Sequence, residues 1–169
     1  METLHAADVL RYAWNDAADE RDDGADDGAG AVERPIPGGA VVVGRDRILA
    51  TGSYEDLRVR FPAARVRRWS GVLGPGRVHE GPLPDAPSPR ERIHAVLKLG
   101  AVAVLDAYVT EDPALRAAAA RVGVTVLPAP PAARRPVLTA TGRADLAVFD
   151  ADGRCLATVC AGRLVHRRA

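Results

Sequence analysis

The sequence predicts an α+β fold, with short β-strands toward both chain ends and a short βα unit of two helices and two parallel strands in the middle. Short β-type segments separated by glycine turns dominate residues 37–69 and 144–169. Helix, strand, helix and strand patterns alternate over residues 89–127. With 169 residues and 47% hydrophobic content, the chain is long enough to bury a sizeable core.

The first segment, residues 3–12, mixes apolar and polar positions and fits a strand or a helix by its pattern alone. We interpret His5 as a buried histidine whose ring is satisfied by a neighbouring side chain. Residues 15–30 follow as a flexible acidic loop, because seven acids against Arg21 alone in residues 16–27 repel one another in any compact form. This loop lacks the fixed ligand spacing of a calcium loop.

Residues 37–69 predict a hairpin, a short helix and a returning strand. Residues 40–43 and 47–51 are the hairpin strands around a tight Gly44-Arg45-Asp46 turn. Ser53, with Asp56 three residues later, is placed as the N-cap of a short helix that Pro62 terminates. Residues 64–69 then return as a strand.

The middle of the chain begins with residues 74–89, where five prolines and three glycines in sixteen residues predict no regular structure. Ser88 is the expected N-cap of a helix over residues 89–100, and Asp112 that of a helix over residues 113–123. The apolar runs at residues 101–105 and 124–127 predict parallel strands covered on both faces.

Residues 144–169 predict three closing strands with turns at residues 150–153 and at Ala161-Gly162. Cys155 and Cys160 lie five residues apart, which puts them on opposite faces of one continuous strand and argues against a disulfide. We interpret both as buried free thiols. Their spacing, without further cysteine or a nearby histidine, is also a poor zinc signal.

Two motifs resemble the amidohydrolase superfamily, specifically its imidazolonepropionase-like members. The first is the strand and Pro-Gly exit VRRWSGVLGPGRVHEGPL at residues 66–83, and the second is the closing ADLAVFD segment that begins at Ala144. The resemblance implies that residues 3–12 are a strand, that Asp145 has a structural role, and that the middle of the chain is a remnant of a catalytic barrel. An eightfold barrel needs about 250 residues, so the chain cannot contain a complete one.

The resemblance also implies a domain division. It implies that residues 1–73 with 137–169 form a discontinuous composite β-domain, a small composite β-sandwich built from both chain ends, and that residues 74–136 form a Pro-rich loop and the α/β remnant. Family members follow the Pro-Gly pair with a V-D-x-H-x-H pattern whose histidines bind a catalytic metal. Here the matching positions hold Gly81 and Leu83.

Other positions of the sequence offer few candidate metal ligands. No two of the four histidines, His5, His79, His94 and His166, have a short ligand spacing on a helix or a strand. His79 and Glu80 are the one adjacent pair in the Pro-rich loop, and they are the candidate metal site, for one divalent ion such as zinc. We expect no cofactor otherwise and name no confident catalytic residue. His166, near an arginine-rich end, is expected to be exposed.

Composition excludes several functional classes. The net charge is +1 and aromatic content is 4%, without a stacking platform or a recognised motif, so nucleic-acid binding is not expected. No apolar run is long enough to cross a membrane and the N-terminus lacks signal-peptide features, which predicts a cytoplasmic protein.

Three functional hypotheses follow. The first is a non-catalytic binding or assembly module that has lost the metal ligands, whose former barrel interface is covered by a second copy of the chain or by a partner protein. The second is a metal-dependent hydrolase of carbon–nitrogen, non-peptide bonds whose site is completed by oligomerisation. The third is a folded gene remnant without a selected role.

Overall fold

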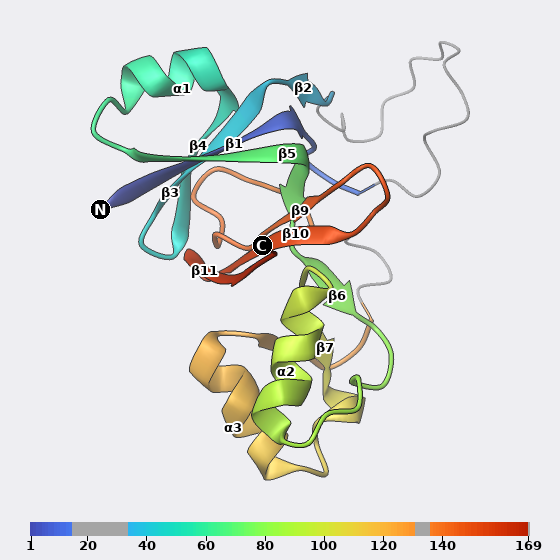
Figure 1. Ribbon diagram of the computed structural model, residues 1–169. Helices are drawn as coiled ribbons and strands as arrows, with labels where there is room; N and C mark the ends of the chain where they lie inside the picture. The colour runs from blue at the N-terminus through green and yellow to red at the C-terminus, as the bar shows by residue number, and fades with distance from the viewer. Residues whose placement is uncertain (15–33, 131–135, 169) are drawn as a thin grey trace, which may run out of the picture.

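The computed structural model describes residues 1–14, 34–130 and 136–168, and the predicted acidic loop at residues 15–30 lies outside this range. The fold is α+β, as predicted, with one large sheet, one small parallel sheet and three α-helices. Figure 1 shows the large sheet above and the small sheet with helices α2 and α3 below. None of the helices in the described ranges is both long enough and apolar enough to cross a membrane.

The large sheet combines strands from both ends of the chain, in the order β11-β10-β9-β5-β1-β3-β4, with β2 paired to β1. The first half contains β1 (Glu2–Leu10), β2 (Ile36–Pro37), β3 (Gly39–Gly44), β4 (Arg47–Ser53) and β5 (Arg65–Pro75), and the second contains β9 (Leu146–Phe149), β10 (Cys155–Cys160) and β11 (Arg163–Arg167). One apolar core, which includes Leu10, Val41, Leu73 and Leu146, collects side chains from both halves. The composite character predicted from the sequence is therefore confirmed.

Strand β5 is the link between the two halves. Its residues Arg65–Leu73 pair in parallel with β1, and its residues Val72–Pro75 pair antiparallel with β9. A bulge in β5 at Ser70 and Gly71 lies opposite Asp8 of β1; Gly71 has a φ of 115°, and the Asp8 carboxylate accepts a hydrogen bond from the Gly71 amide at 2.7 Å. The predicted strand at residues 64–69 is thus too short, because pairing with β9 carries β5 on through the Gly-Pro sequence.

Helix α1 (Tyr54–Arg60) follows β4 and packs on the face of β1 and β3 that is opposite the core described above (Figure 1). The Ser53 hydroxyl accepts a hydrogen bond from the Asp56 amide at 3.1 Å, which is the N-cap predicted from the sequence. Leu57 points from the helix into a second core with Leu4 and Val42. Because β1 is covered on both faces, its sequence lacks the simple alternation of a half-exposed strand.

The small sheet has the order β6-β7-β8 and is parallel throughout. Its strands are β6 (Arg77–His79), β7 (Ala101–Leu105) and β8 (Thr125–Leu127), and helices α2 (Pro89–Lys98) and α3 (Pro113–Val122) connect them, with a short 3₁₀ turn, η1 (Asp106–Tyr108), after β7. The two parallel strands predicted here are present as β7 and β8, and β6 adds a third, so the prediction that residues 74–89 lack regular structure was wrong at β6. Three residues of β6 gain pairing from β7, which a Pro/Gly-rich sequence does not reveal.

Both connecting helices begin and pack as expected. The Ser88 and Asp112 side chains accept hydrogen bonds from amides of the first turns of α2 and α3. Val102 and Val104 of β7 pack against the helices in a core with Ile93, Leu97 and Leu115. On the opposite face of the sheet, pairing aligns Val78, Ala103 and Thr125.

Helix α2 also contacts the closing strands, so the α/β segment is attached to the large sheet. The buried Thr158 hydroxyl of β10 donates to the carbonyl of Leu97 at 2.7 Å. Cys155 and Cys160 are both buried and free, as predicted, and lie in different apolar clusters. Burial raises the pKa of both thiols, that of Cys160 to about 11, which keeps them protonated near neutral pH.

Candidate functional site

The carboxyl ends of the parallel strands β6, β7 and β8 meet at one edge of the small sheet, where α/β folds usually place functional groups. His79 is the last residue of β6, and Asp106 follows the last residue of β7. The sequence placed His79 and Glu80 in an irregular loop. The structure instead puts His79 on a strand whose end faces this edge.

His79 is already engaged within its own turn. Its Nε2 atom lies 2.9 Å from the carbonyl oxygen of Pro82. Because a carbonyl only accepts, Nε2 must carry the proton and donate, which leaves Nδ1 as the single lone pair available to a metal. Glu80 is exposed to solvent. The predicted pair is therefore accessible and supplies at most one imidazole nitrogen and one carboxylate.

Asp106, the nearest acid in sequence after β7, has a structural partner. Its carboxylate accepts a hydrogen bond from the Arg116 guanidinium of α3, and its backbone carbonyl accepts one from the Thr110 hydroxyl at 2.8 Å. Within the described residues, no three His, Cys, Asp or Glu side chains lie close enough together to hold a metal ion. Among the described residues, His79 and Glu80 are therefore a pair of possible metal donors at this edge without a third ligand.

The remaining histidines occupy two other places. His5 is 3% exposed, its Nδ1 accepts a hydrogen bond from Trp69 Nε1 at 3.3 Å, and burial lowers its pKa to about 4, with a smaller effect of the Arg67 charge. The interpretation of His5 as a satisfied core histidine is confirmed. His166 of β11 is half-buried rather than exposed, because its ring packs edge-on against His94 of α2 with centroids 6.4 Å apart.

A cationic pocket that the sequence did not predict lies where the end of α2 meets the large sheet. Arg77 of β6 stacks on aromatic rings there: its guanidinium carbon is 3.9 Å from the Phe149 ring centroid and 5.1 Å from that of Trp14. The Trp14 indole donates to the Pro75 carbonyl at 2.6 Å and meets Phe149 edge-on. Trp14, Arg77 and Phe149 are far apart in sequence, so no local pattern could have grouped them.

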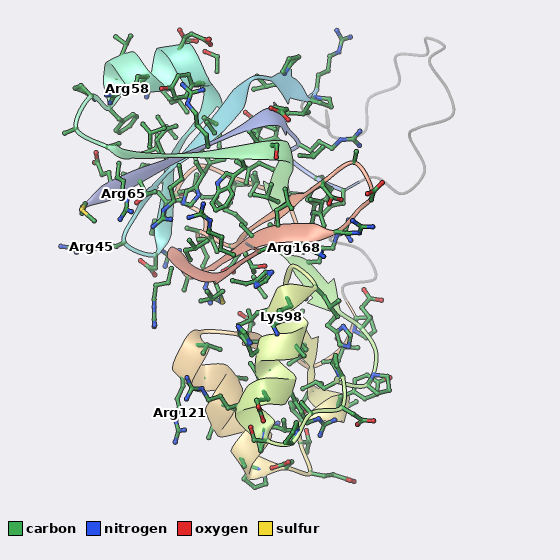
Figure 2. All side chains as sticks on the ribbon, in the orientation of Figure 1. Arg45, Arg58, Arg65, Lys98, Arg121 and Arg168 are labelled. Atoms are coloured by element: carbon green, nitrogen blue, oxygen red, sulfur yellow. The ribbon has the colours of Figure 1, made fainter. Side chains whose placement is uncertain are left out.

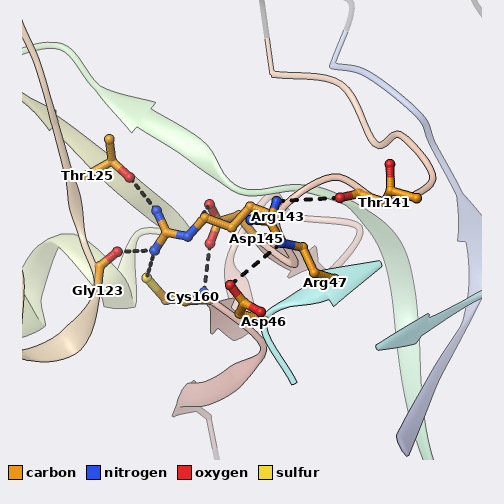
Figure 3. Close-up of polar contacts among 9 residues, drawn as sticks. Asp46, Arg47, Gly123, Thr125, Thr141, Arg143, Asp145 and Cys160 are labelled. Atoms are coloured by element: carbon orange, nitrogen blue, oxygen red, sulfur yellow. Dashed lines mark hydrogen bonds and ion pairs between the residues drawn. The ribbon is translucent and has the colours of Figure 1, made fainter. Parts of the chain in front are cut away.

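Asp145 has the structural role that the resemblance implied. Its carboxylate accepts a hydrogen bond from the Ala161 amide at 2.8 Å, at the β10–β11 turn, and lies 3.5 Å from Nε of Arg143. Figure 3 shows Arg143 extending from this pair to Gly123, Thr125 and Cys160. Burial raises the pKa of Asp145, while the Ala161 amide and the Arg143 charge oppose that rise. These contacts hold segments together, beside a cavity of about 280 Å³ that Thr125, Arg143 and Asp145 help to line.

Comparison with protein families identifies one segment of the chain. Residues 39–64, which contain the β3–β4 hairpin and α1, match the model of the imidazolonepropionase-like composite domain of bacteria. No curated protein sequence matches the chain.

Comparison with solved structures extends the similarity to the fold. Guanine deaminase from Bradyrhizobium japonicum has a TM-score of 0.50 and 16% identity over 75% of this chain and 34% of its own. Guanine deaminase from E. coli has a TM-score of 0.49 and 14% identity over 75% of this chain and 35% of its own. A triazine hydrolase from Arthrobacter aurescens has a TM-score of 0.45 and 15% identity over 74% of this chain and 34% of its own. The chain spans about a third of the length of these enzymes. The similarity to the first of them shows a shared fold.

Proposed function

We propose that this chain, an amidohydrolase-related composite domain, serves as a non-catalytic binding or assembly module. Metal-dependent hydrolysis needs at least three convergent protein ligands and an open coordination position for water. The observation that carries the proposal is the place of Leu83. In the resemblance, this position belongs to a metal-binding histidine, and here its side chain is 4% exposed and packs with Ile93 and Val96 of α2.

The edge of the small sheet supports the same conclusion. Leu83 stabilises the helix layer by burial of apolar surface, and a histidine there would point into the same core. His79 donates to Pro82, and Asp106 binds Arg116, so the two polar groups that the strands bring to this edge stabilise local structure. Fold kinship carries no activity once the site residues have other roles.

A second candidate function is a metal-dependent hydrolase acting on carbon–nitrogen, non-peptide bonds, with its ligand set completed across an oligomer interface. The position of His79 at the carboxyl end of β6, beside the exposed Glu80, favours it. In this case His79 Nδ1 and Glu80 would hold the metal, which would supply an activated water.

The metal content of the purified protein separates the two functions. The untagged protein is purified without chelator, dialysed against zinc, manganese or iron in turn, and analysed by plasma mass spectrometry beside a His79→Ala, Glu80→Ala variant. An exposed histidine elsewhere, His94→Ala, serves as the matched control. The module proposal expects the same sub-stoichiometric content in all three proteins. Near-stoichiometric metal that is lost only from the double variant would overturn it in favour of the hydrolase.

The assembly role requires an occupant for the face of the small sheet opposite α2 and α3. Val78, Thr125 and Leu127 of this face are half-buried in the isolated chain. We propose a second copy of the chain as the occupant. Size-exclusion chromatography with light scattering is expected to give a dimer, and a Leu127→Arg substitution on the same face is expected to shift it toward the monomer. The measurement is made at roughly 100 µM, which is about the dissociation constant of a weak homodimer. A monomer of the unmodified protein at this concentration would contradict the proposal.

A further inference from the structure

The cationic pocket between α2 and the large sheet has the size of a small-ligand site, with a volume of about 510 Å³. Its charged lining comes from four separate places in the chain: Arg77 of β6, Lys98 of α2, Arg154 before β10, and Arg168 after β11. His166 lines it as well. In Figure 2 the labelled Lys98 and Arg168 lie at the junction of the helical segment with the large sheet. No aspartate or glutamate is among its described lining residues.

Three of these cations have no acidic partner among the described residues. Arg77 makes ring contacts with Phe149 and Trp14, and no ion pair within the described ranges joins Arg77, Lys98 or Arg168 to a carboxylate. Arg154 has a contact of 3.6 Å with Asp152, and both side chains are more than half exposed. The pocket therefore concentrates positive charge that the described part of the chain does not neutralise.

The stacking of Arg77 prepares it for anion binding. A guanidinium that lies on an aromatic ring uses its face, whereas its five N–H donors lie in its plane and remain available to oxygen atoms. The ring contacts also restrict the long side chain before any ligand binds, so less conformational entropy is lost on binding. Charged hydrogen bonds from a fork of this kind match phosphate geometry.

An apolar surface adjoins the cations. Leu99, which is 50% exposed, and Phe149 both line the pocket. We propose that the pocket binds a small organic phosphate monoester, with its phosphate oxygens held by Arg77, Lys98 and Arg168 and its apolar part against Leu99. This site is separate from the His79 edge, so the inference goes beyond the proposed function and its failure leaves the assembly role untouched.

Calorimetric titration of the full chain with phenyl phosphate tests the proposal. Saturable binding is expected at low ionic strength, tighter than for inorganic phosphate and weakened by added salt. A Lys98→Gln, Arg168→Gln variant is expected to weaken binding by at least about tenfold, because it removes two charged contacts. The matched control is Arg58→Gln, Arg121→Gln, which removes the same charge from exposed positions outside the pocket and is expected to leave affinity within about twofold.

Three results would overturn the proposal. They are the absence of saturable binding of phenyl phosphate to the unmodified chain, equal loss of affinity in the pocket and control variants, and displacement of phenyl phosphate by a single-stranded oligonucleotide that binds tightly. The last result would identify the surface as a nucleic-acid contact, because an extended polyanion shows a much steeper salt dependence than one phosphate. Circular dichroism of each variant confirms that the fold is retained before its affinity is compared.

Proton binding by His166 provides a second readout. Burial lowers the pKa of His166, and the charges of His94, Lys98 and Arg168 add to that effect, with Arg77 and Arg154 lining the same pocket. A bound phosphate dianion stabilises the imidazolium, so saturation with phenyl phosphate is expected to raise the pKa of His166 in an NMR titration of its ring protons. Equal titration of His166 with and without ligand would contradict binding at this site.

Discussion

The guanidinium of Arg143 donates a hydrogen bond to the hydroxyl of Thr125, and this contact ties the segment that precedes β9 to strand β8 of the small sheet (Figure 3). The same guanidinium donates to the carbonyl of Gly123 and faces the carboxylate of Asp145. One side chain therefore joins the closing strands of the large sheet to the α/β segment. The groups that contact Arg143 are neutral or acidic, and they lie between the large sheet and the α/β segment.

Replacement of Arg143 by alanine is expected to lower the free energy of unfolding by roughly 2–4 kcal/mol, because it removes the charge partner of Asp145, which keeps the Ala161 amide, and leaves the Gly123 carbonyl without the Arg143 donor. Urea unfolding at neutral pH measures the change. Arg121→Ala, which removes an exposed arginine at the end of α3, is the control and is expected to change stability by less than about 0.5 kcal/mol. Similar midpoints for the two variants would show that the Arg143 contacts carry little free energy.

Stability is expected to fall as the pH is lowered from about 7 to about 4, with His5 as one cause. Its folded pKa of about 4 lies below the ordinary 6.5, so between these two pH values the unfolded chain binds a proton at His5 and the folded chain does not. The stabilisation is complete above pH 6.5 and is lost as the pH falls to the folded value, and the difference corresponds to roughly 3 kcal/mol. Urea unfolding at several pH values measures this slope.

A His5→Gln variant is expected to flatten the slope, since an amide oxygen still accepts from Trp69 and does not titrate in this range. His166, whose pKa is also lowered by burial, contributes a slope of the same sign that remains in the variant. Arg58→Gln, at an exposed position of α1, is the control and should keep the original slope. An unchanged slope in His5→Gln would contradict the assignment.

Two glycines with nearly the same backbone conformation are expected to respond differently to alanine. Gly153 and Gly162 have φ values of 75° and 76°, so an added methyl group costs about 1 kcal/mol at either from backbone strain. At Gly153 the added carbon has nothing within 4 Å, whereas at Gly162 it would overlap the carbonyl oxygen of Arg45. Gly162→Ala is therefore expected to cost roughly 3 kcal/mol or more. Thermal unfolding compares the two variants, and equal losses would show that the β10–β11 and β3–β4 turns separate easily.

Local signals in the sequence predicted much of the secondary structure. Ser53, Ser88 and Asp112 were placed as N-caps from their own residue type and the helical pattern after them, and all three accept the expected amide hydrogen bonds. Gly123 was placed at the end of α3 and has the left-handed conformation that ends a helix. Each of these features is decided within about four residues, and so a sequence window contains all that is needed.

The errors concern features that a distant strand creates. Strand β6 exists because β7 lies beside it, and β5 extends to Pro75 because β9 pairs with its end. The half-burial of His166 was missed because its partner, His94, stands on a helix 72 positions earlier (166 − 94). In the same way, the site residues His79 and Glu80 were chosen for their types, and their surroundings follow from the Pro82 carbonyl and the neighbouring strand.

The sequence by itself determined the α+β class and the residues at which the helices begin, because residue type and short-range spacing carry that information. Tertiary structure alone decided which charges meet. It brought Arg77 onto Phe149 and placed Lys98 and Arg168 around one pocket from opposite parts of the chain. Coulombic and ring contacts act over a few ångströms of space and are indifferent to separation along the chain, so only the folded arrangement reveals them.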